Sequence, residues 1–452
     1  MRRFYKVFKT ADNENLVTLP GGLLKAAGLK ENDTVSLNFG TMTATAAVKS
    51  AKAGSPEELS LGLSAGVFCA LKIPDGLRLL AKNTGDKKFR LGPVIGILTF
   101  SSHIPRRLSY YYNYYLKNKF GGLIYVFSGK GINVKKQVIS GYYYDTRART
   151  WKTGEFPFPD AVLDRCYPTV RAYHTLLERI IGPGKISNKR NLINKIDFTE
   201  TLNADPVLRA YVPETMKIHD VADVLYFIQK YRTVFLKPSN AMKGKGIIVV
   251  KKHGEGFECN FQLHGKDVIK VVPSADEIMG LLRSVTGRKR TYLVQPAVDC
   301  MEYRGSPFSI RTCPTKDVTG RWIMPGMIAL GAYGKTKSLI TNYASGGRRI
   351  PLQDLFGAIV PNLAYTRDEL TSLLESLSLK VAQVLDKRFG PLGELGLDLV
   401  IDRNGKPWVL EANGNPNRRA AYKQTEYPHW PARLYGYILG YAVYLAGFTG
   451  QS

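Results

Sequence analysis

Three residues near the end of the chain have the types and spacing of a metal site. Asp398, Glu411 and Asn413 flank the pair Asn404-Gly405, which favours a two-residue type I′ turn because both central residues of that turn need positive φ. A turn at this pair places Asp398 directly opposite Glu411 on the neighbouring antiparallel strand. Because side chains alternate between the two faces of a strand, Asn413 lies on the same face as Glu411.

Two carboxylates and an amide oxygen that converge on one spot suit a hard divalent cation, and we expect Mg2+ that carries nucleotide phosphates. The alternative from these residues alone is a pair of solvated acids on an edge hairpin. The turn sets the register in this interpretation. Moving it by one residue should separate Asp398 from Glu411 and abolish nucleotide turnover, while most of the fold remains.

A glycine-rich loop lies upstream of the acidic hairpin. Segment 233–252 has the pattern of strand, loop and strand, and Lys237 closes the first strand. Loop glycines let the backbone approach an anion closely with its N–H groups pointing inward. The loop residues of interest are Lys243, Gly244, Lys245 and Gly246. The loop lacks the spacing of a P-loop, but together with Lys195 and the acidic hairpin it predicts a triphosphate site.

The next segment, 291–311, has the residues expected of a nucleoside site. A predicted strand runs into an extended linker that can offer backbone N–H and C=O groups to an adenine edge; it consists of Gln295, Pro296, Ala297 and Val298. Glu302 could accept hydrogen bonds from ribose hydroxyls. Arg311 could stabilise the negative charge of a phosphoryl or acyl-phosphate transition state. Each of these residues taken singly is also compatible with an ordinary surface position.

Charge is the unusual bulk property of this chain. Lys and Arg number 64 and Asp and Glu number 37, which gives a formal net charge of +27, whereas 44% hydrophobic and 22% charged residues are ordinary for a globular protein. The basic residues recur in small groups along the chain. This charge favours polyanionic partners such as nucleotides, nucleic acid, an acidic polypeptide or an anionic surface. A generally basic solvated surface without a dedicated partner is the alternative.

The chain shows no sign of export or membrane insertion. Its first ten residues lack the apolar core of a secretory signal. The longest apolar run, Leu434 to Phe448, is shorter than the roughly 20 residues that span a bilayer, and we expect a carboxy-terminal helix packed on the body. The five cysteines are scattered and never spaced as CxxC, which favours reduced thiols in the cytoplasm over zinc or disulfides.

A chain of 452 residues is too long for one core, and we expect three domains. Residues 1–90 predict a small β-rich domain. Residues 91–184 predict a βαβ domain, because apolar strands at 94–100 and 123–128 flank a tyrosine-rich helix. Residues 185–452 carry the motifs; they divide into a glycine-loop subdomain at about 195–295 and a metal-hairpin subdomain at about 296–430, followed by the carboxy-terminal helix.

The order and spacing of these motifs resemble the ATP-grasp superfamily over about residues 185–425, and segment 92–170 resembles the domain that precedes it in those enzymes. More narrowly, the chain resembles the YheC/YheD family of endospore coat-associated proteins through GPVIGILTF, PFPDAVLDR, TNYASGG and ELGLDLVIDRNGKPWVLEANGNP. This likeness covers nearly the whole chain. It implies a mixed α/β (α+β) protein: an ATP-grasp fold with a preceding βαβ domain and a small β-rich amino-terminal domain.

The resemblance implies a nucleotide-binding role for each matching residue. Lys195 and Lys237 would hold the α- and β-phosphates of ATP, and the loop at 242–246 would fold over the triphosphate. The linker at 295–298 would bind adenine, and Glu302 would bind ribose.

The resemblance also implies a metal site and an acceptor loop. Asp398, Glu411 and Asn413 would ligate Mg2+, and Arg311, with Lys237, would serve catalysis by steadying the transferred phosphate. Related ligases place a loop near the acceptor at the positions of Asn342, Gly346 and Gly347. Two departures stand out: relatives often have Asp-x-Arg where this chain has Ser309-Ile310-Arg311, and some ligases have a catalytic Arg where this chain has Gly396.

The resulting functional hypothesis is an ATP- and Mg-dependent carboxylate–amine ligase that works through an acyl phosphate, with an acidic peptide or polymer among the candidate substrates. A kinase that uses the same fold is the first alternative, and a non-catalytic, nucleotide-binding coat protein is the second. Nucleic-acid binding is a weaker idea, because the sequence contains no recognisable nucleic-acid module. The cysteine pattern favours the cytoplasm, and the resemblance implies association with the spore coat of a spore-forming bacterium.

Overall fold

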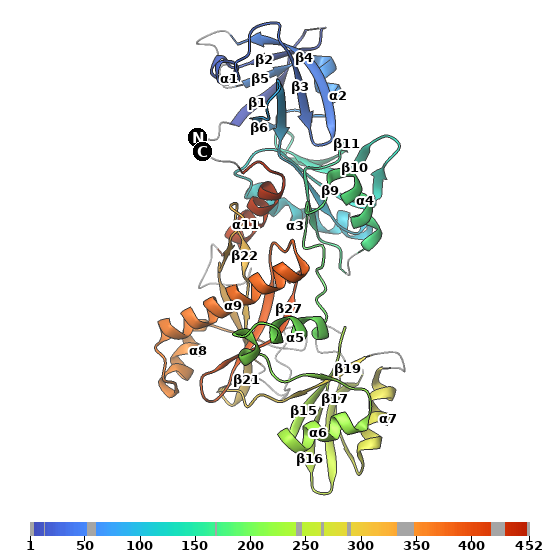
Figure 1. The fold of residues 1–452 in the computed structure, drawn as a ribbon, viewed down its shortest axis with the longest axis vertical. Helices are drawn as coiled ribbons and strands as arrows, with labels where there is room; N and C mark the ends of the chain where they lie inside the picture. Colours follow the sequence, from blue (N-terminus) through green and yellow to red (C-terminus); the bar gives the residue numbers. More distant parts are fainter. Residues whose placement is uncertain are drawn as a thin grey trace.

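The computed structural model describes most of the chain. The residues that it describes are 4–12, 14–51, 60–167, 170–240, 246–263, 266–286, 291–331, 348–416 and 430–449. The molecule is elongated, and its sheets follow one another along the long axis (Figure 1). We call them the barrel, the middle sheet, the hairpin sheet and the glycine-loop sheet, in the order in which they lie along that axis.

The barrel contains the first strands of the chain. Its elements are β1 (Phe4–Lys9), β2 (Leu16–Leu19), α1 (Gly21–Ala26), β3 (Thr34–Phe39), β4 (Met42–Ser50), β5 (Ser60–Leu63), α2 (Ala65–Ala70), β6 (Arg78–Asn83) and β7 (Lys88–Gly92). The strands close in the order β1-β5-β2-β4-β3-β7-β6. Alternate residues of β3, including Val35, Leu37 and Phe39, fill the interior, as the two-residue period of a strand requires.

The middle sheet has the predicted βαβ unit at its centre. Its elements are β8 (Val94–Leu98), α3 (Ile104–Leu116), β9 (Leu123–Asn133), β10 (Val138–Asp145), β11 (Thr150–Pro157), β12 (Ala161–Asp164), α4 (Arg171–Ile181) and β13 (Ile186–Ser187). The strand order is β11-β10-β9-β8-β12-β13, with β8 parallel to both β9 and β12. Strand β8 is buried along its whole length, which explains its uninterrupted apolar sequence.

The glycine-loop sheet lies at the far end of the molecule from the barrel (Figure 1). Its strands are β14 (Met216–Lys217), β15 (Thr233–Pro238), β16 (Ile248–His253), β17 (Gly256–Leu263), β18 (Lys266–Val272) and β19 (Tyr292–Pro296), in the order β14-β19-β15-β16-β17-β18. Helices α6 (Val221–Tyr231) and α7 (Ala275–Thr286) pack on it through a shared core that includes Phe227, Ile228 and Ile278.

The hairpin sheet carries the acidic residues. Its strands are β20 (Glu302–Tyr303), β21 (Ser306–Thr312), β24 (Met327–Gly331), β25 (Arg348–Ile350), β26 (Gly396–Ile401) and β27 (Pro407–Asn413), in the order β25-β24-β21-β26-β27 with β20 beside β21. Helices α5 (Lys195–Asn203), α8 (Leu352–Ile359) and α9 (Arg367–Phe389) contribute to its core. A separate ribbon pairs β22 (Thr315–Lys316) with β23 (Trp322–Ile323).

The last helix, α11 (Trp430–Leu445), is the predicted carboxy-terminal helix and packs on the body. It contacts α3, β12 and β22, so it lies between the middle sheet and the hairpin sheet (Figure 1). Among the described residues, no helix has the length and apolar character needed to cross a bilayer.

The carbonyl end of α11 is capped by cations from earlier parts of the chain. Lys185 Nζ donates to the carbonyl of Leu445 at 2.5 Å, Arg90 to that of Ala446 at 2.9 Å, and Lys82 to that of Gly447 at 2.9 Å. Positive charge at this position also opposes the negative end of the helix dipole. The barrel, through Arg90 and Lys82, is therefore attached to the last helix of the chain.

Candidate active site

The β26–β27 hairpin brings Asp398 directly opposite Glu411, as predicted. The turn itself differs from the prediction. The N–H of Asp402 donates to the carbonyl of Lys406 at 3.0 Å, and the N–H of Gly405 donates to the carbonyl of Asp402 at 2.9 Å. Asp402 and Lys406 therefore close the loop, which contains the three residues 403–405. In this hairpin Gly405 has a φ of 84° and Asn404 keeps negative φ, which rules out the predicted type I′ turn. The prediction of a two-residue turn is therefore wrong, because the loop is one residue longer.

A β-bulge further along the hairpin restores the predicted pairing. Leu399 faces Val409, but Asp398 faces Glu411, so Leu410 is the extra residue on β27. Without the bulge, strict alternation from the buried Val409 would turn Glu411 toward the core. With it, Ala412 takes the buried position and Glu411 comes to the same open face as Asn413.

Each carboxylate has a cationic partner. Arg311 on β21 is the direct cross-strand neighbour of Asp398, and its guanidinium holds both oxygens of that carboxylate, with Nη2 to Oδ2 at 2.6 Å. Lys195 Nζ lies 3.4 Å from Glu411 Oε2. Asn413 Nδ2 donates to Glu411 Oε1 at 3.3 Å. The structure thus brings five residues predicted from separate segments into one cluster.

Burial and these neighbours shift the pKa values of both acids. Burial raises the pKa of Asp398 to about 6, against the lowering effect of Arg311. Burial alone would raise the pKa of Glu411, but Lys195 and the hydrogen bond with Asp398 lower it to about 2. The two carboxyl groups are therefore close enough to share a proton or a cation.

The cluster fits a divalent cation. Two facing carboxylates and a neighbouring amide are oxygen donors of the kind that Mg2+ takes. Within the described residues no three His, Cys, Asp or Glu side chains gather into a metal-binding group, so any metal here would depend on these two acids, Asn413 and oxygens of a bound ligand such as phosphate.

Lys237 reaches the same region from the glycine-loop sheet. The N–H of Lys195, at the start of α5, donates to the carbonyl of Ser239 at 3.2 Å, which joins α5 to the strand end that carries Lys237. Burial and the nearby Lys195 ammonium lower the pKa of Lys237 to about 8. Lys237 Nζ donates to Gln295 Oε1, so the first residue of the predicted adenine linker contacts a predicted phosphate lysine.

The other predicted residues that the structure describes form no hydrogen bond or ion pair with the two acids or the two lysines. In the linker, Pro296 ends β19, Ala297 donates its N–H to Thr233 at 3.0 Å, and Val298 is half-buried. Glu302 is exposed on β20, near Arg403. Gly246 has a φ of 73°, and its carbonyl accepts from Tyr292. The remaining predicted residues lie outside the described part of the chain; they are Lys243, Gly244, Lys245, Asn342, Gly346 and Gly347.

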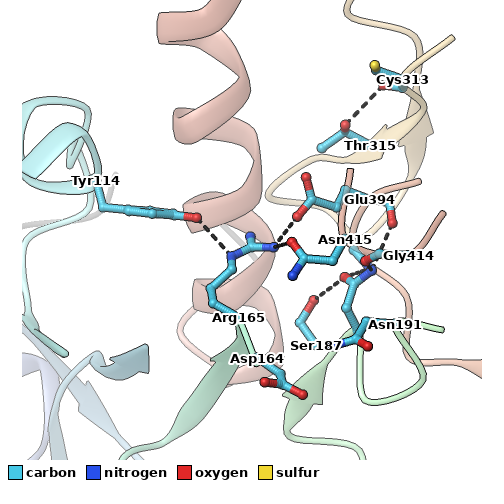
Figure 2. A network of polar contacts seen from close by, with 12 residues as sticks. Tyr114, Asp164, Arg165, Ser187, Asn191, Cys313, Thr315, Glu394, Gly414 and Asn415 are labelled. Carbon is cyan, nitrogen blue, oxygen red and sulfur yellow. Dashed lines mark hydrogen bonds and ion pairs between the residues drawn. The ribbon is translucent and has the colours of Figure 1, made fainter. Parts of the chain in front are cut away.

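A buried polar network behind the acidic hairpin was not predicted. Arg165, just after β12, forms an ion pair with Glu394, just before β26, and their side chains are 5% and 1% exposed (Figure 2). Arg165 also donates to the Tyr114 hydroxyl at 3.1 Å and to Asn415 Oδ1 at 3.4 Å. The middle sheet and the hairpin sheet are thus joined by charges that water hardly reaches.

Two asparagines extend this junction to the backbone of the hairpin. Asn188 Nδ2 donates to the carbonyls of Glu394 at 2.8 Å and Gly414 at 2.5 Å, and its Oδ1 accepts from the N–H of Gly393 at 2.8 Å. Asn191 accepts at its carbonyl from the N–H of Gly414 at 3.2 Å. The only sequence signal for this junction is that Arg165 and Glu394 end or begin two of the family-like stretches.

The fold, with two antiparallel sheets that converge on facing acids and lysines, is of the ATP-grasp class. The model of the YheC/D-like ATP-grasp family matches residues 184–445, and the chain belongs to this family. Two Bacillus subtilis (strain 168) proteins are similar to it. Endospore coat-associated protein YheD is 26% identical over 422 residues, which cover 90% of this chain and 88% of YheD. Endospore coat-associated protein YheC is 25% identical over 315 residues, which cover 68% of this chain and 84% of YheC.

Among solved structures, D-alanyl-alanine synthetase A from Vibrio cholerae O1 is 13% identical, with a TM-score of 0.46 over 79% of this chain and 98% of that one. A likeness this loose has no bearing on activity.

Proposed function

We propose that this protein is an ATP- and Mg-dependent ligase that joins a carboxylate to an amine through an acyl phosphate. The observation that supports this most is the convergence of Asp398, Glu411, Lys195 and Lys237 from separate segments. Facing acids beside paired lysines suit a metal–triphosphate complex, in which the lysines balance phosphate charge and the acids hold the metal.

The proposed roles follow from these positions. Lys195 and Lys237 bind phosphate oxygens, and the linker at 295–298 contacts adenine. Asp398, Glu411 and Asn413 hold Mg2+, which would neutralise charge on the phosphates when bound. Glu302, the loop at 242–246 and the acceptor residues Asn342, Gly346 and Gly347 keep the nucleotide and substrate roles that their positions in the sequence suggest.

The reaction proceeds in two balanced steps. An oxygen of the substrate carboxylate attacks the γ-phosphorus, the bond from that phosphorus to ADP breaks, and an acyl phosphate forms. The amine nitrogen then attacks the acyl carbon, the carbon–oxygen bond to phosphate breaks, and the nitrogen loses a proton. Negative charge builds up on the transferred phosphoryl group, and Arg311, which is held beside Asp398, would stabilise it.

The basic surface and the relatives' names support two finer proposals. A formal net charge of +27 suits an acidic peptide or polymer as the carboxylate substrate. The names of the two Bacillus subtilis relatives support association with the spore coat. The domain division at about residues 90 and 184 belongs to the same proposal, with the segment before 184 contributing to substrate choice.

The test is release of ADP and phosphate from ATP and Mg2+ in the presence of candidate acids and amines. D398A and E411A should abolish it, whereas E214A, at a surface ion pair in the glycine-loop half, should not. Trapping of a hydroxamate by hydroxylamine would support the acyl phosphate. A phosphorylated product that survives hydroxylamine would favour a kinase instead. Nucleotide binding by the wild type without any turnover would favour the non-catalytic, nucleotide-binding coat protein. Failure of the wild type to bind nucleotide would overturn the ligase, the kinase and that alternative together.

A further inference from the structure

Three polar side chains lie side by side on one face of the glycine-loop sheet. Phe235 on β15 faces Gln295 on β19, and Lys237 follows two residues later on the same face. On the other side of β19, Met216 faces Val294 and Lys217 faces Leu293, so Thr215 continues that ladder opposite Gln295. Gln295, whose side chain is buried, is therefore flanked by Thr215 and Lys237.

Hydrogen bonds connect these side chains in one direction. The Thr215 hydroxyl donates to the carbonyl of Pro213 at 2.8 Å. Because its single hydrogen is used there, the hydroxyl oxygen can only accept from its other neighbour. That neighbour is Gln295, whose Nε2 donates to Thr215 Oγ1 at 2.9 Å, and Gln295 Oε1 in turn accepts from Lys237 Nζ.

We infer that Thr215 is a positioning residue for the nucleotide site: it fixes the orientation of the Gln295 carboxamide so that an oxygen, and not an NH2 group, faces the Lys237 ammonium. This inference rests on the proposed function, in which Lys237 binds phosphate. A proline carbonyl can only accept, and an ammonium can only donate, so the two ends of the chain of hydrogen bonds permit one orientation of Gln295. A flipped carboxamide would place two donors against each other at the ammonium.

The use of glutamine has a chemical consequence. A neutral carboxamide holds the ammonium in place without cancelling its charge, whereas a carboxylate at position 295 would pair with it. Lys237 thus keeps its positive charge for the phosphates of the ligand. Both polar atoms of the Gln295 side chain are used inside the protein, so within the linker at 295–298 recognition of the base would fall to backbone groups.

The first experiment compares T215V with T215S in the full-length protein. The probe is AMP-PNP with Mg2+, and isothermal titration calorimetry measures its Kd. T215V should weaken binding about five- to tenfold, the usual effect of losing one buried hydrogen-bond partner. T215S keeps the hydroxyl and should bind within about twofold of wild type. Equal affinity of wild type and T215V, or an equal loss in T215S, would overturn the inference.

The second experiment separates positioning from a general structural role. If Thr215 acts through Gln295, then T215V should weaken AMP-PNP binding no further in a Q295A background. Losses of affinity that add in the double variant would overturn the inference. So would a result in which T215V and T215S lose the same affinity and the same unfolding temperature as each other. Absence of AMP-PNP binding by the wild type would overturn the proposed function and this inference together, whereas binding by the wild type with additive losses would overturn the inference alone.

Discussion

Arg165 and Glu394 form an ion pair between the middle sheet and the hairpin sheet, at a place where neither side chain is more than 5% exposed. They are 229 residues apart in the chain, and the guanidinium also donates to the Tyr114 hydroxyl and to Asn415 Oδ1. Because charges are costly to bury, this pair constrains which surfaces of the two sheets can meet.

Removing one member of this pair should be far worse than removing both. R165M removes the Arg165 cation from beside the buried Glu394 carboxylate, which should cost about 3–5 kcal/mol of unfolding free energy. The double variant R165M/E394L should recover a large part of that loss, because no uncompensated charge remains. Urea unfolding followed by tryptophan fluorescence measures both effects.

The exposed pair Lys230–Glu214 is the matched control for this prediction, since its side chains are 45% and 43% exposed. K230M should change the unfolding free energy by less than about 1 kcal/mol. If R165M costs no more than K230M, then the buried pair does not hold the sheets together.

The bulge at Leu410 should be essential to the metal site. Insertion of one alanine between Asp398 and Leu399, opposite Leu410, gives the extra residue a partner and removes the bulge. Strict alternation from Val409 then turns Glu411 toward the core. We expect loss of Mn2+ binding in the presence of AMP-PNP, measured by electron paramagnetic resonance, together with a lower unfolding temperature. E411A should lose the same Mn2+ binding with little loss of stability. Retention of the bound-Mn2+ signal after the insertion would show that the bulge does not orient Glu411.

Nucleotide binding should weaken as pH rises through about 8. Burial and Lys195 lower the pKa of Lys237 to about 8, so this side chain is charged below that pH and neutral above it. Loss of the charge should raise the Kd for AMP-PNP by up to about tenfold per pH unit. K237R stays charged throughout and should bind almost equally at about pH 7 and about pH 9.5. A wild-type Kd that stays flat over this range would contradict the prediction.

The cap of α11 predicts which cation matters most for stability. Arg90 contacts Ala446, the buried Asp160 at 2.7 Å and the ring of Phe448, whereas the exposed Lys82 contacts the Gly447 carbonyl. R90A leaves Asp160 with the N–H of Val94 as its hydrogen-bond donor and should cost about 1–3 kcal/mol. K82A should cost less than about 0.5 kcal/mol. Thermal unfolding and proteolysis of the carboxy-terminal helix check this order, which equal effects of the two variants would contradict.

The predicted pairing of Asp398 with Glu411 is correct because two differences between the predicted and the observed hairpin cancel. Asn404-Gly405 was assigned a two-residue turn, but the loop contains three residues, and the extra Leu410 in β27 compensates for the difference. Local propensity favours a turn at this pair without deciding its type. The bulge has no local signature, because it depends on whether Glu411 can be accommodated in the core.

Residues that act through distant neighbours were missed. Thr215 is 80 residues from Gln295, and nothing around it distinguishes it from other threonines. The role inferred for Thr215 depends on the pairing of β14 with β19, which is a tertiary property. Lys237, Asp398 and Glu411 were predicted from local patterns of strand, glycine loop and hairpin, and Lys195 from the resemblance to the ATP-grasp superfamily. The apolar run 94–98 and the strand–helix–strand order were likewise enough to predict the centre of the middle sheet.

Helix α11 has a consequence for synthesis of the chain. One face of the middle sheet, including Ile97, Val126 and Leu163, shares a core with this helix, which is made long after the sheet. Residues 188–429 are translated in between, which takes tens of seconds at about 5–20 residues per second. For that interval this face of the nascent middle sheet is covered by α3 but lacks α11, so apolar side chains that the folded protein buries stay open to chaperones that bind such surfaces.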